Sequence, residues 1–325
     1  MYKITTTLVL ATLLIASCGK PNSPEDYTGG YEISGSIATY GDANAVVVDG
    51  NYAYVTQGEG GLAVFNVSNP KTPILVTNVS DNMDGYSTKV IKKDNFLYIA
   101  AGTGGINRVD ITDPTNPIPL NRDVNGKIVD IQFMDDYLIS AASESGYKVT
   151  YVTADYFDAR GTIDTNGFAK GLTITADNSK LFVATGEMGL SLYDISNFED
   201  GYGEYPVLSS VNLPGYAENV VLNQAKQVAF VSCGAGGLQV IDYSDSANIR
   251  IVGTYDCAGY AKDLVYENNK LYLTASGLQV YDVSTPADPK ILGIVDSEYA
   301  YSLALDSDNI YVADKEQGLL IIPKK

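Results

Sequence analysis

The chain has 325 residues, a formal net charge of −18 and a pI near 4.2, so nucleic acid and anionic membrane surfaces, which repel an acidic face, are excluded as its main partners. It contains no histidine. Without imidazole there is no Ser-His-Asp or Cys-His nucleophile and no His-ligated metal, so the common hydrolase mechanisms are excluded, and neither a metal nor another cofactor is expected.

Residues 1–17 have the pattern of a signal peptide. Lys3 precedes an apolar run, Leu8 to Ala16, that is too short to span a bilayer. The sequence Ile15-Ala16-Ser17-Cys18 resembles the lipobox of bacterial lipoproteins, and this resemblance implies cleavage before Cys18 and lipidation of its side chain. The alternative is an ordinary secretory signal in which the cysteine occurs by chance.

Residues 18–30 follow as a polar segment containing Pro and Gly, which is typical of a flexible tether. Together with the lipobox, this segment predicts a lipid-anchored protein of the bacterial cell envelope. We expect it at the outer membrane, facing either the periplasm or the cell surface.

The rest of the chain consists of seven repeats, each with an apolar strand before a turn that usually contains glycine. The residues in register are Tyr54, Tyr98, Ile139, Phe182, Phe230, Tyr272 and Tyr311. They are 39 to 48 positions apart, with no helical pattern between them. This period is typical of a propeller or a similar repeat array.

Each repeat contains four short strands separated by turn residues. In the second repeat they are expected at Lys89–Lys92, Phe96–Ala101, Ile106–Ile111 and Ile118–Asn121. Several strands are apolar at consecutive positions, which indicates that both faces are covered. The sequence therefore predicts an all-β fold over residues 31–325, a seven-bladed β-propeller of four-stranded antiparallel blades.

The two ends of this region complete one blade. The seventh repeat stops after its third strand, "GLLIIPKK", whereas residues 33–38 match the fourth strands of other repeats. We therefore expect this N-terminal strand to join the blade that begins at Tyr299. Such closure leaves no blade unpaired at the seam.

The third strand of most repeats carries a common motif, Gly-Leu-x-Val-x-Asp-Val/Ile-Ser. It is "GLQVIDYS" from Gly237 and "GLQVYDVS" from Gly277. This motif resembles that of the LVIVD-repeat family of bacterial propeller proteins, and the resemblance implies the fold and an envelope location more than an activity. The third repeat lacks the Asp, and the fourth has an enlarged loop, Ser196–Pro206.

The crossovers between blades and the loops between second and third strands lie on one face, the top face. The crossovers place aromatic side chains at equivalent positions around the ring: Tyr86, Phe168, Tyr216, Tyr260 and Tyr299. Near them, at the mouth of the central channel, we expect Lys89, Asp130, Lys170, Glu218, Lys262, Asp263 and Tyr301. Tyrosine faces stack well on sugars and peptides, so the ligand-binding candidates are the five crossover aromatics with Tyr301, Glu218 and Asp263. The alternative is that the crossover aromatics only fill the wedges between blades.

Three other features are weaker candidates. The enlarged loop, expected on the opposite, bottom face, contains Phe198, Glu199, Asp200, Tyr202, Glu204 and Tyr205, which either grip a partner or belong to a neutral insertion. Cys233 and Cys257 form a candidate disulfide near the top face, or else two unpaired thiols. Asp306–Asn309 is interpreted as a turn and not as a calcium loop.

These observations favour an envelope-anchored, non-catalytic propeller that binds a protein or glycan through a loop-lined face. One alternative is a carboxylate-dependent hydrolase or lyase that uses Asp130, Glu218 or Asp263 as acid and base at the channel mouth. The other alternative is a purely structural or assembly scaffold.

Overall fold

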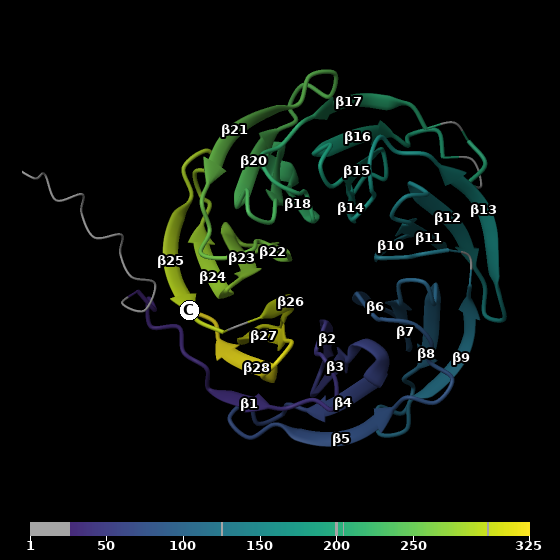
Figure 1. Cartoon of the computed structure of the whole chain (residues 1–325), viewed down its shortest axis with the longest axis vertical. Coiled ribbons are helices and arrows are strands. Elements are labelled where there is room, and N and C mark those ends of the chain that lie inside the picture. The colour runs from purple at the N-terminus through teal and green to yellow at the C-terminus, as the bar shows by residue number, and fades with distance from the viewer. Residues whose placement is uncertain (1–26, 125, 199–200, 204, 298) are drawn as a thin grey trace, which may run out of the picture.

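The seven predicted repeats form a closed ring of seven four-stranded antiparallel sheets (Figure 1). The computed structural model describes residues 27–325 except 125, 199–200, 204 and 298. The first strand of each blade lies at the centre of the ring and the fourth at the rim (Figure 1). This confirms the predicted seven-bladed β-propeller. The signal peptide 1–17, the lipidation site Cys18 and tether residues 18–26 lie outside the described residues.

The first four blades each contain four strands, as predicted, and in blade 2 the strand ends lie within two residues of the predicted positions. Blade 1 contains β2 (Ala45–Asp49), β3 (Tyr52–Thr56), β4 (Leu62–Asn66) and β5 (Ile74–Val79). Blade 2 contains β6 (Lys89–Lys93), β7 (Phe96–Ala100), β8 (Ile106–Asp110) and β9 (Ile118–Asp123). Blade 3 contains β10 (Asp130–Met134), β11 (Tyr137–Ala141), β12 (Tyr147–Val152) and β13 (Phe157–Ile163). Blade 4 contains β14 (Gly171–Ile174), β15 (Lys180–Ala184), β16 (Leu190–Asp194) and β17 (Val207–Val211).

The last three blades repeat this order. Blade 5 contains β18 (Asn219–Asn223), β19 (Val228–Ser232), β20 (Leu238–Asp242) and β21 (Arg250–Tyr255). Blade 6 contains β22 (Leu264–Glu267), β23 (Lys270–Ala275), β24 (Gly277–Asp282) and β25 (Lys290–Val295). Blade 7 contains β26 (Ala300–Leu305), β27 (Asn309–Asp314), β28 (Gly318–Pro323) and β1 (Gly35–Ile37). Short 3₁₀ turns occur at η2 (Gly58–Gly60) and η3 (Gln224–Lys226).

Blade 7 is closed by the N-terminal strand, as predicted. β1 pairs antiparallel with β28, with Gly35 opposite Ile321 and Ile37 opposite Leu319. It lies along the outer edge of β28 (Figure 1). The first and last strands of the ring therefore share one sheet, and the edge of β28 is not left open.

The glycine of the repeated motif is required by the close approach of the fourth strand. Gly237 and Gly277 have φ of +71° and +95°, which L side chains rarely adopt. A Cβ atom on either would lie 2.1 Å from a carbonyl oxygen, that of Tyr255 or of Val295. The "GLQV" sequence therefore recurs because each third strand starts at the same tight turn, packed closely against the fourth strand of its blade.

The aspartate of the motif ends the third strand with a turn. Asp242 Oδ1 accepts a hydrogen bond from the backbone N–H of Ser244 at 2.9 Å, and Asp282 Oδ1 accepts one from Ser284 at 2.7 Å. Hydrogen bonds from the following serine lower the pKa of both aspartates. The Asp-x-Ser spacing is thus an Asx turn.

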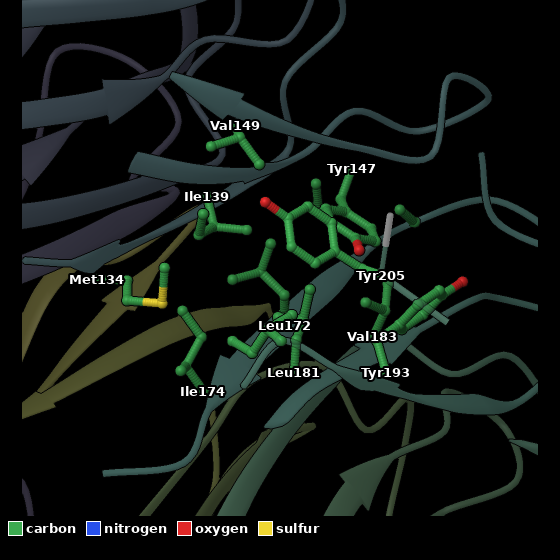
Figure 2. Packing of buried hydrophobic residues seen from close by; sticks show 13 residues of the cluster. Met134, Ile139, Tyr147, Val149, Leu172, Ile174, Leu181, Val183, Tyr193 and Tyr205 are labelled. Atoms are coloured by element: carbon green, nitrogen blue, oxygen red, sulfur yellow. The ribbon is translucent and has the colours of Figure 1, made fainter. Parts of the chain in front are cut away.

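The hydrophobic core is divided among the joints between blades. The seven residues predicted in register are all buried. Figure 2 shows the joint between blades 3 and 4, where Leu172 and Val183 of blade 4 pack with Val149 of blade 3. Tyr147 and Tyr193 meet edge to face across it, with ring centroids 5.2 Å apart. Apolar residues at consecutive strand positions are therefore buried on both faces of a blade.

Candidate functional site

A hollow of about 180 Å³ lies at the mouth of the central channel on the top face. Its lining comes from inner strands and crossovers of all seven blades: Asn44, Tyr86, Ser87, Thr88, Lys89, Val129, Asp130, Lys170, Glu218, Asn219, Lys262, Asp263, Tyr301 and Ser302. All seven residues predicted at the channel mouth are among them, together with Tyr86. We call this hollow the channel mouth.

The lining is built in two tiers of equivalent positions. The lower tier contains the residues opposite the end of each second strand, for example Lys89 opposite Ala100 and Asn219 opposite Ser232. It comprises Ala45, Lys89, Asp130, Gly171, Asn219, Asp263 and Ser302. The upper tier, one residue earlier in each blade, comprises Asn44, Thr88, Val129, Lys170, Glu218, Lys262 and Tyr301.

The side chains of these tiers differ from blade to blade, whereas the core positions are apolar in every blade. Core packing therefore does not determine which side chains occupy the two tiers. Asn44, Asn219 and Ser302 were missed in the sequence analysis, although they stand in register with predicted residues. Counting positions from the start of each inner strand would have found them.

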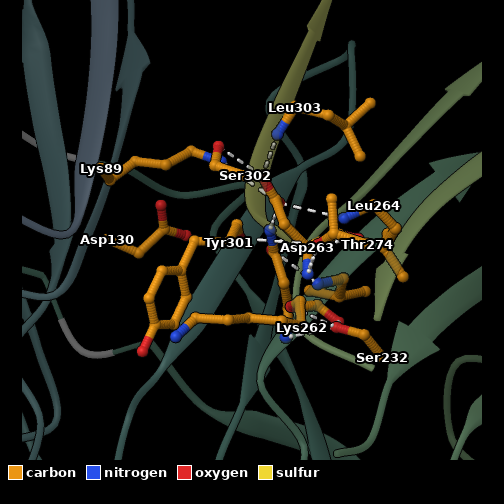
Figure 3. Close-up of polar contacts among 12 residues, drawn as sticks. Lys89, Asp130, Ser232, Lys262, Asp263, Leu264, Thr274, Tyr301, Ser302 and Leu303 are labelled. Atoms are coloured by element: carbon orange, nitrogen blue, oxygen red, sulfur yellow. Dashed lines mark hydrogen bonds and ion pairs between the residues drawn. The ribbon is translucent and has the colours of Figure 1, made fainter. Parts of the chain in front are cut away.

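Asp263 is the centre of a buried polar network (Figure 3). Its Oδ1 accepts hydrogen bonds from Asn219 Nδ2 at 2.6 Å and Leu264 N at 3.0 Å. Its Oδ2 accepts hydrogen bonds from Ser302 Oγ at 2.7 Å and Leu303 N at 3.3 Å. One carboxylate thereby joins blades 5, 6 and 7 at the channel wall.

Lys89 and Asp130 continue this network into blades 2 and 3. Lys89 Nζ lies 3.6 Å from Asp263 Oδ1. Burial alone would lower the pKa of Lys89, but the carboxylates of Asp263 and Asp130 outweigh it and raise that pKa. Asp130 Oδ2 accepts a hydrogen bond from Leu172 N at 2.8 Å, while its buried Oδ1 has no hydrogen-bond partner among the described residues. Burial raises the pKa of Asp130 to about 6.

Two further lysines of the upper tier lie over aromatic rings. Lys262 Nζ is 3.4 Å from the ring centroid of Tyr301, and Lys170 Nζ is 5.2 Å from that of Tyr216. Burial lowers the pKa of Lys262 to about 8, and Lys170 adds to this effect although Glu218 opposes it. The channel mouth therefore contains amines that are only weakly compensated.

The crossover aromatics have both packing and exposed surfaces. Tyr216 and Tyr260 cover glycines of the preceding blade, since a Cβ on Gly186 or Gly234 would lie 2.8 Å or less from the tyrosine ring. Tyr260 remains 47% exposed, and its hydroxyl donates to Glu218 Oε1 at 2.6 Å. The wedge-filling role thus coexists with an accessible ring face.

The other three crossover aromatics are also exposed. Tyr86 covers Gly58 and donates a hydrogen bond to Asp42 Oδ2 at 3.0 Å. Phe168 and Tyr299 are 41% and 52% exposed. The crossover positions therefore place a discontinuous ring of accessible aromatic side chains around the channel mouth.

Cys233 and Cys257, the cysteines among the described residues, are free thiols in this structure, so the candidate disulfide between them is not formed here. Cys233 is buried, and the Sγ of half-buried Cys257 accepts a hydrogen bond from Tyr281 Oη at 3.7 Å. Burial raises the pKa of Cys233 to about 12 and that of Cys257 to about 11. Both thiols are therefore protonated at neutral pH, which makes them poor nucleophiles.

The enlarged loop of blade 4 is mostly packed against the protein. Phe198 stacks on Tyr205 with ring centroids 5.6 Å apart and meets Tyr137 edge to face. Tyr205 is buried, whereas Tyr202 is 65% exposed. Phe198 and Tyr205 therefore pack against the protein and are not free to grip a partner, in contrast to the first of the two predicted roles. Glu199, Asp200 and Glu204 lie outside the described residues.

Acidic residues of the described chain form turns and do not cluster as metal ligands. The described chain contains no group of three or more His, Cys, Asp or Glu side chains arranged to hold a metal ion. Asp306 Oδ1 accepts hydrogen bonds from the backbone of Asp308 and Asn309, in agreement with a simple turn. No helix among residues 27–325, gaps aside, has the length and apolar character needed to cross a membrane.

Comparison with known proteins identifies the repeat and the fold. The LVIVD repeat matches residues 40–81, 84–122, 214–257, 258–297 and 298–322. The unmatched segment, 123–213, holds blades 3 and 4, the two repeats that depart from the motif. No curated protein matches the sequence.

Two solved structures share the fold at low sequence identity. The WD40 β-propeller domain of Doa1 superposes with a TM-score of 0.70 at 13% identity, with 91% of this chain and 97% of that chain covered. The computationally designed Ika8 protein gives a TM-score of 0.66 at 12% identity, with coverages of 90% and 100%.

Proposed function

The chain belongs to the LVIVD repeat family, and from that premise we propose that it is a non-catalytic binding propeller, anchored in the bacterial envelope through a lipid on Cys18, that holds a glycan on its top face. The observation that carries the proposal is the polar channel mouth encircled by separate, partly exposed aromatic side chains. Sugars combine apolar ring faces with many hydroxyls, so they suit isolated aromatics beside polar groups. A protein partner is favoured by a contiguous apolar patch, which these separated rings do not form.

Catalysis by paired carboxylates is less well supported by the same geometry. A glycosidase needs two carboxyl groups free to face the scissile bond. Both oxygens of Asp263 already accept hydrogen bonds from protein donors, and Glu218 accepts a hydrogen bond from the hydroxyl of Tyr260. Only Asp130 combines a raised pKa with an unpartnered oxygen, and a single acid does not complete the pair.

A purely structural ring does not account for the channel mouth. The lysines there and the unpartnered Oδ1 of Asp130 cost stability without improving the packing between blades. Packing of the repeat does not require these side chains at the tier positions. Their presence there therefore favours a ligand-binding role over a purely structural one.

The proposed glycan site is tested with two top-face substitutions made together, Phe168→Ala and Tyr299→Ala. Neither side chain covers a glycine, so the fold should persist, while loss of two stacking faces should weaken binding about tenfold. The measurement is binding of the mature protein to an array of bacterial envelope glycans. Tyr202→Ala, an exposed tyrosine on the bottom face, is the matched control and should bind like the parent.

Either of two outcomes would contradict the glycan proposal. One is the absence of any glycan bound by the parent. The other is equal binding by the parent and the double variant. If cross-linking to native envelope instead captures a protein that the double variant loses, the top face is a protein-binding surface.

The proposed anchor is tested separately with Cys18→Ala in a bacterial host. The parent should incorporate labelled palmitate and sediment with membranes, because more than one acyl chain gives stable anchoring. The variant should lose the label and become soluble in the periplasm or medium. Incorporation of equal label into both proteins would rule out Cys18 as the attachment point.

A further inference from the structure

We infer that the channel mouth binds a sugar acid, that is, a carboxylate carried on a hydroxylated carbon skeleton. This inference deepens the proposed glycan-binding function and rests on it, because it names the chemistry of the ligand at the same site. The carboxylate meets Lys170 and Lys262, and a hydroxyl meets Asp130.

Three lysines converge on this hollow in a chain where acidic residues outnumber basic ones by 39 to 21. Lys89 has a counter-ion, since its amine lies 3.6 Å from Asp263 Oδ1. The side-chain amines of Lys170 and Lys262 form no ion pair or hydrogen bond with any residue that the structure describes, and they face aromatic rings. A half-buried cation without a counter-ion is costly, and a ligand carboxylate would supply charge-assisted hydrogen bonds.

The acidic groups near Lys262 do not replace such a ligand. Glu218 and Asp263 favour its charged form, but burial and the nearby cations Lys170 and Lys315 outweigh them. The net result is the pKa of about 8. Glu218 is also engaged by the hydroxyl of Tyr260 at 2.6 Å. An added anion would therefore restore charge balance around the amine.

The hydroxyl contact comes from Asp130, in the tier below. Its unpartnered Oδ1 belongs to a side chain that is 5% exposed and lines the hollow. Ionised, this oxygen accepts a ligand O–H; protonated, the carboxyl group also donates. The 180 Å³ hollow equals the volume of about six water molecules, enough for one sugar residue but not for an oligosaccharide. Any further sugar residues of a longer glycan would extend out of the hollow and across the crossover aromatics.

The same groups make binding depend on pH. Above about pH 6 the ionised Asp130 carboxylate, facing Lys89 and Asp263, adds negative charge beside the ligand anion. Above about pH 8 Lys262, facing Lys170, Glu218, Asp263, Lys315 and the Tyr301 ring, loses its positive charge. Both changes weaken anion binding as the pH rises, so affinity should be highest on the acid side of pH 6.

The test is calorimetric titration of the mature protein with galacturonate and with neutral galactose. At about pH 5, galacturonate should bind about tenfold more tightly than galactose, and Lys262→Met should remove that difference. Lys290→Met, which alters an exposed lysine paired with Asp288, is the matched control and should change nothing. For the parent, galacturonate affinity should fall about tenfold or more between about pH 5 and about pH 9. Asp130→Asn should flatten the part of this fall that lies near pH 6.

A trimer of galacturonate distinguishes two sources of the acid. Tighter binding of the trimer, lost on replacing Phe168 and Tyr299, identifies the end of an acidic glycan, whereas equal binding identifies a free sugar acid. The inference is overturned if galactose binds as well as galacturonate, if Lys262→Met leaves the difference intact, or if galacturonate shows no binding at about 10 mM. If the array then shows binding of neutral glycans that depends on the top face, the proposed glycan-binding function still stands. If the protein binds no glycan on the array, both the proposed function and the sugar-acid inference are rejected.

Discussion

Asp263→Ala should lower the free energy of unfolding by about 3–5 kcal/mol. The substitution leaves half-buried Lys89 without its counter-ion and removes the acceptor shared by Asn219, Ser302 and two backbone N–H groups. Each buried donor left without a partner costs about 1–3 kcal/mol, and one alanine removes the partner of several. Urea denaturation followed by circular dichroism measures the change.

The control for this prediction is Asp288→Ala. Asp288 also pairs with a lysine, Lys290, at 2.7 Å, but both side chains are exposed. Its loss should change stability by less than about 1 kcal/mol. Equal effects of the two substitutions would mean that the Asp263 network contributes nothing to the closure of the ring.

A chain that begins at Thr39 should lose the closed ring. It lacks β1, which covers the edge of β28, and Tyr31, which is buried between blades 6 and 7. Loss of a buried aromatic alone costs about 3–5 kcal/mol, so we expect the melting temperature to fall by about 10 °C or more. The uncovered edge should also drive association between molecules.

Size-exclusion chromatography and thermal denaturation test this prediction together. A chain that begins at Tyr27 retains β1 and Tyr31, and it should remain monodisperse with the parent's melting temperature. Closure by β1 would be unnecessary if the Thr39 chain behaved identically.

The fold could be predicted because repeated local signals agree with it. Gly237 and Gly277 mark the same tight turn in successive blades, and Asp242 and Asp282 mark the same Asx turn. The missing fourth strand of the last repeat, together with residues 33–38, was sufficient to predict closure. These features depend on neighbours in sequence or on an exact repeat, so sequence reasoning reaches them.

The composition of the channel mouth could be predicted only in part. Register placed Lys89, Asp130 and Asp263 together, but it could not show that Asp263 is saturated with donors while Asp130 keeps an unpartnered oxygen. That difference depends on side chains from blades far apart in the chain. Two carboxylates in equivalent positions therefore differ in their hydrogen-bond partners.

The enlarged loop shows the same limit. Its aromatic side chains suggest an exposed surface when read as a segment, yet Phe198 and Tyr205 stack on each other and pack against blade 3. Only contact with Tyr137, some sixty positions earlier in the sequence, reveals this. Exposure of a loop aromatic is therefore the property that sequence alone predicted least well.

Lysine footprinting tests the central claim, a glycan site at the channel mouth, most directly. The mature protein is acetylated near pH 8, with and without an envelope glycan at a concentration that saturates binding at this pH, and each lysine is quantified by mass spectrometry. Because the pKa of Lys262 is about 8, its amine should react readily in the free protein, and bound glycan should protect Lys262 and Lys170. Lys290, exposed and outside the channel mouth, should react equally in both samples. Unchanged acetylation of Lys170 and Lys262, or protection confined to lysines outside the hollow, would contradict the proposed site.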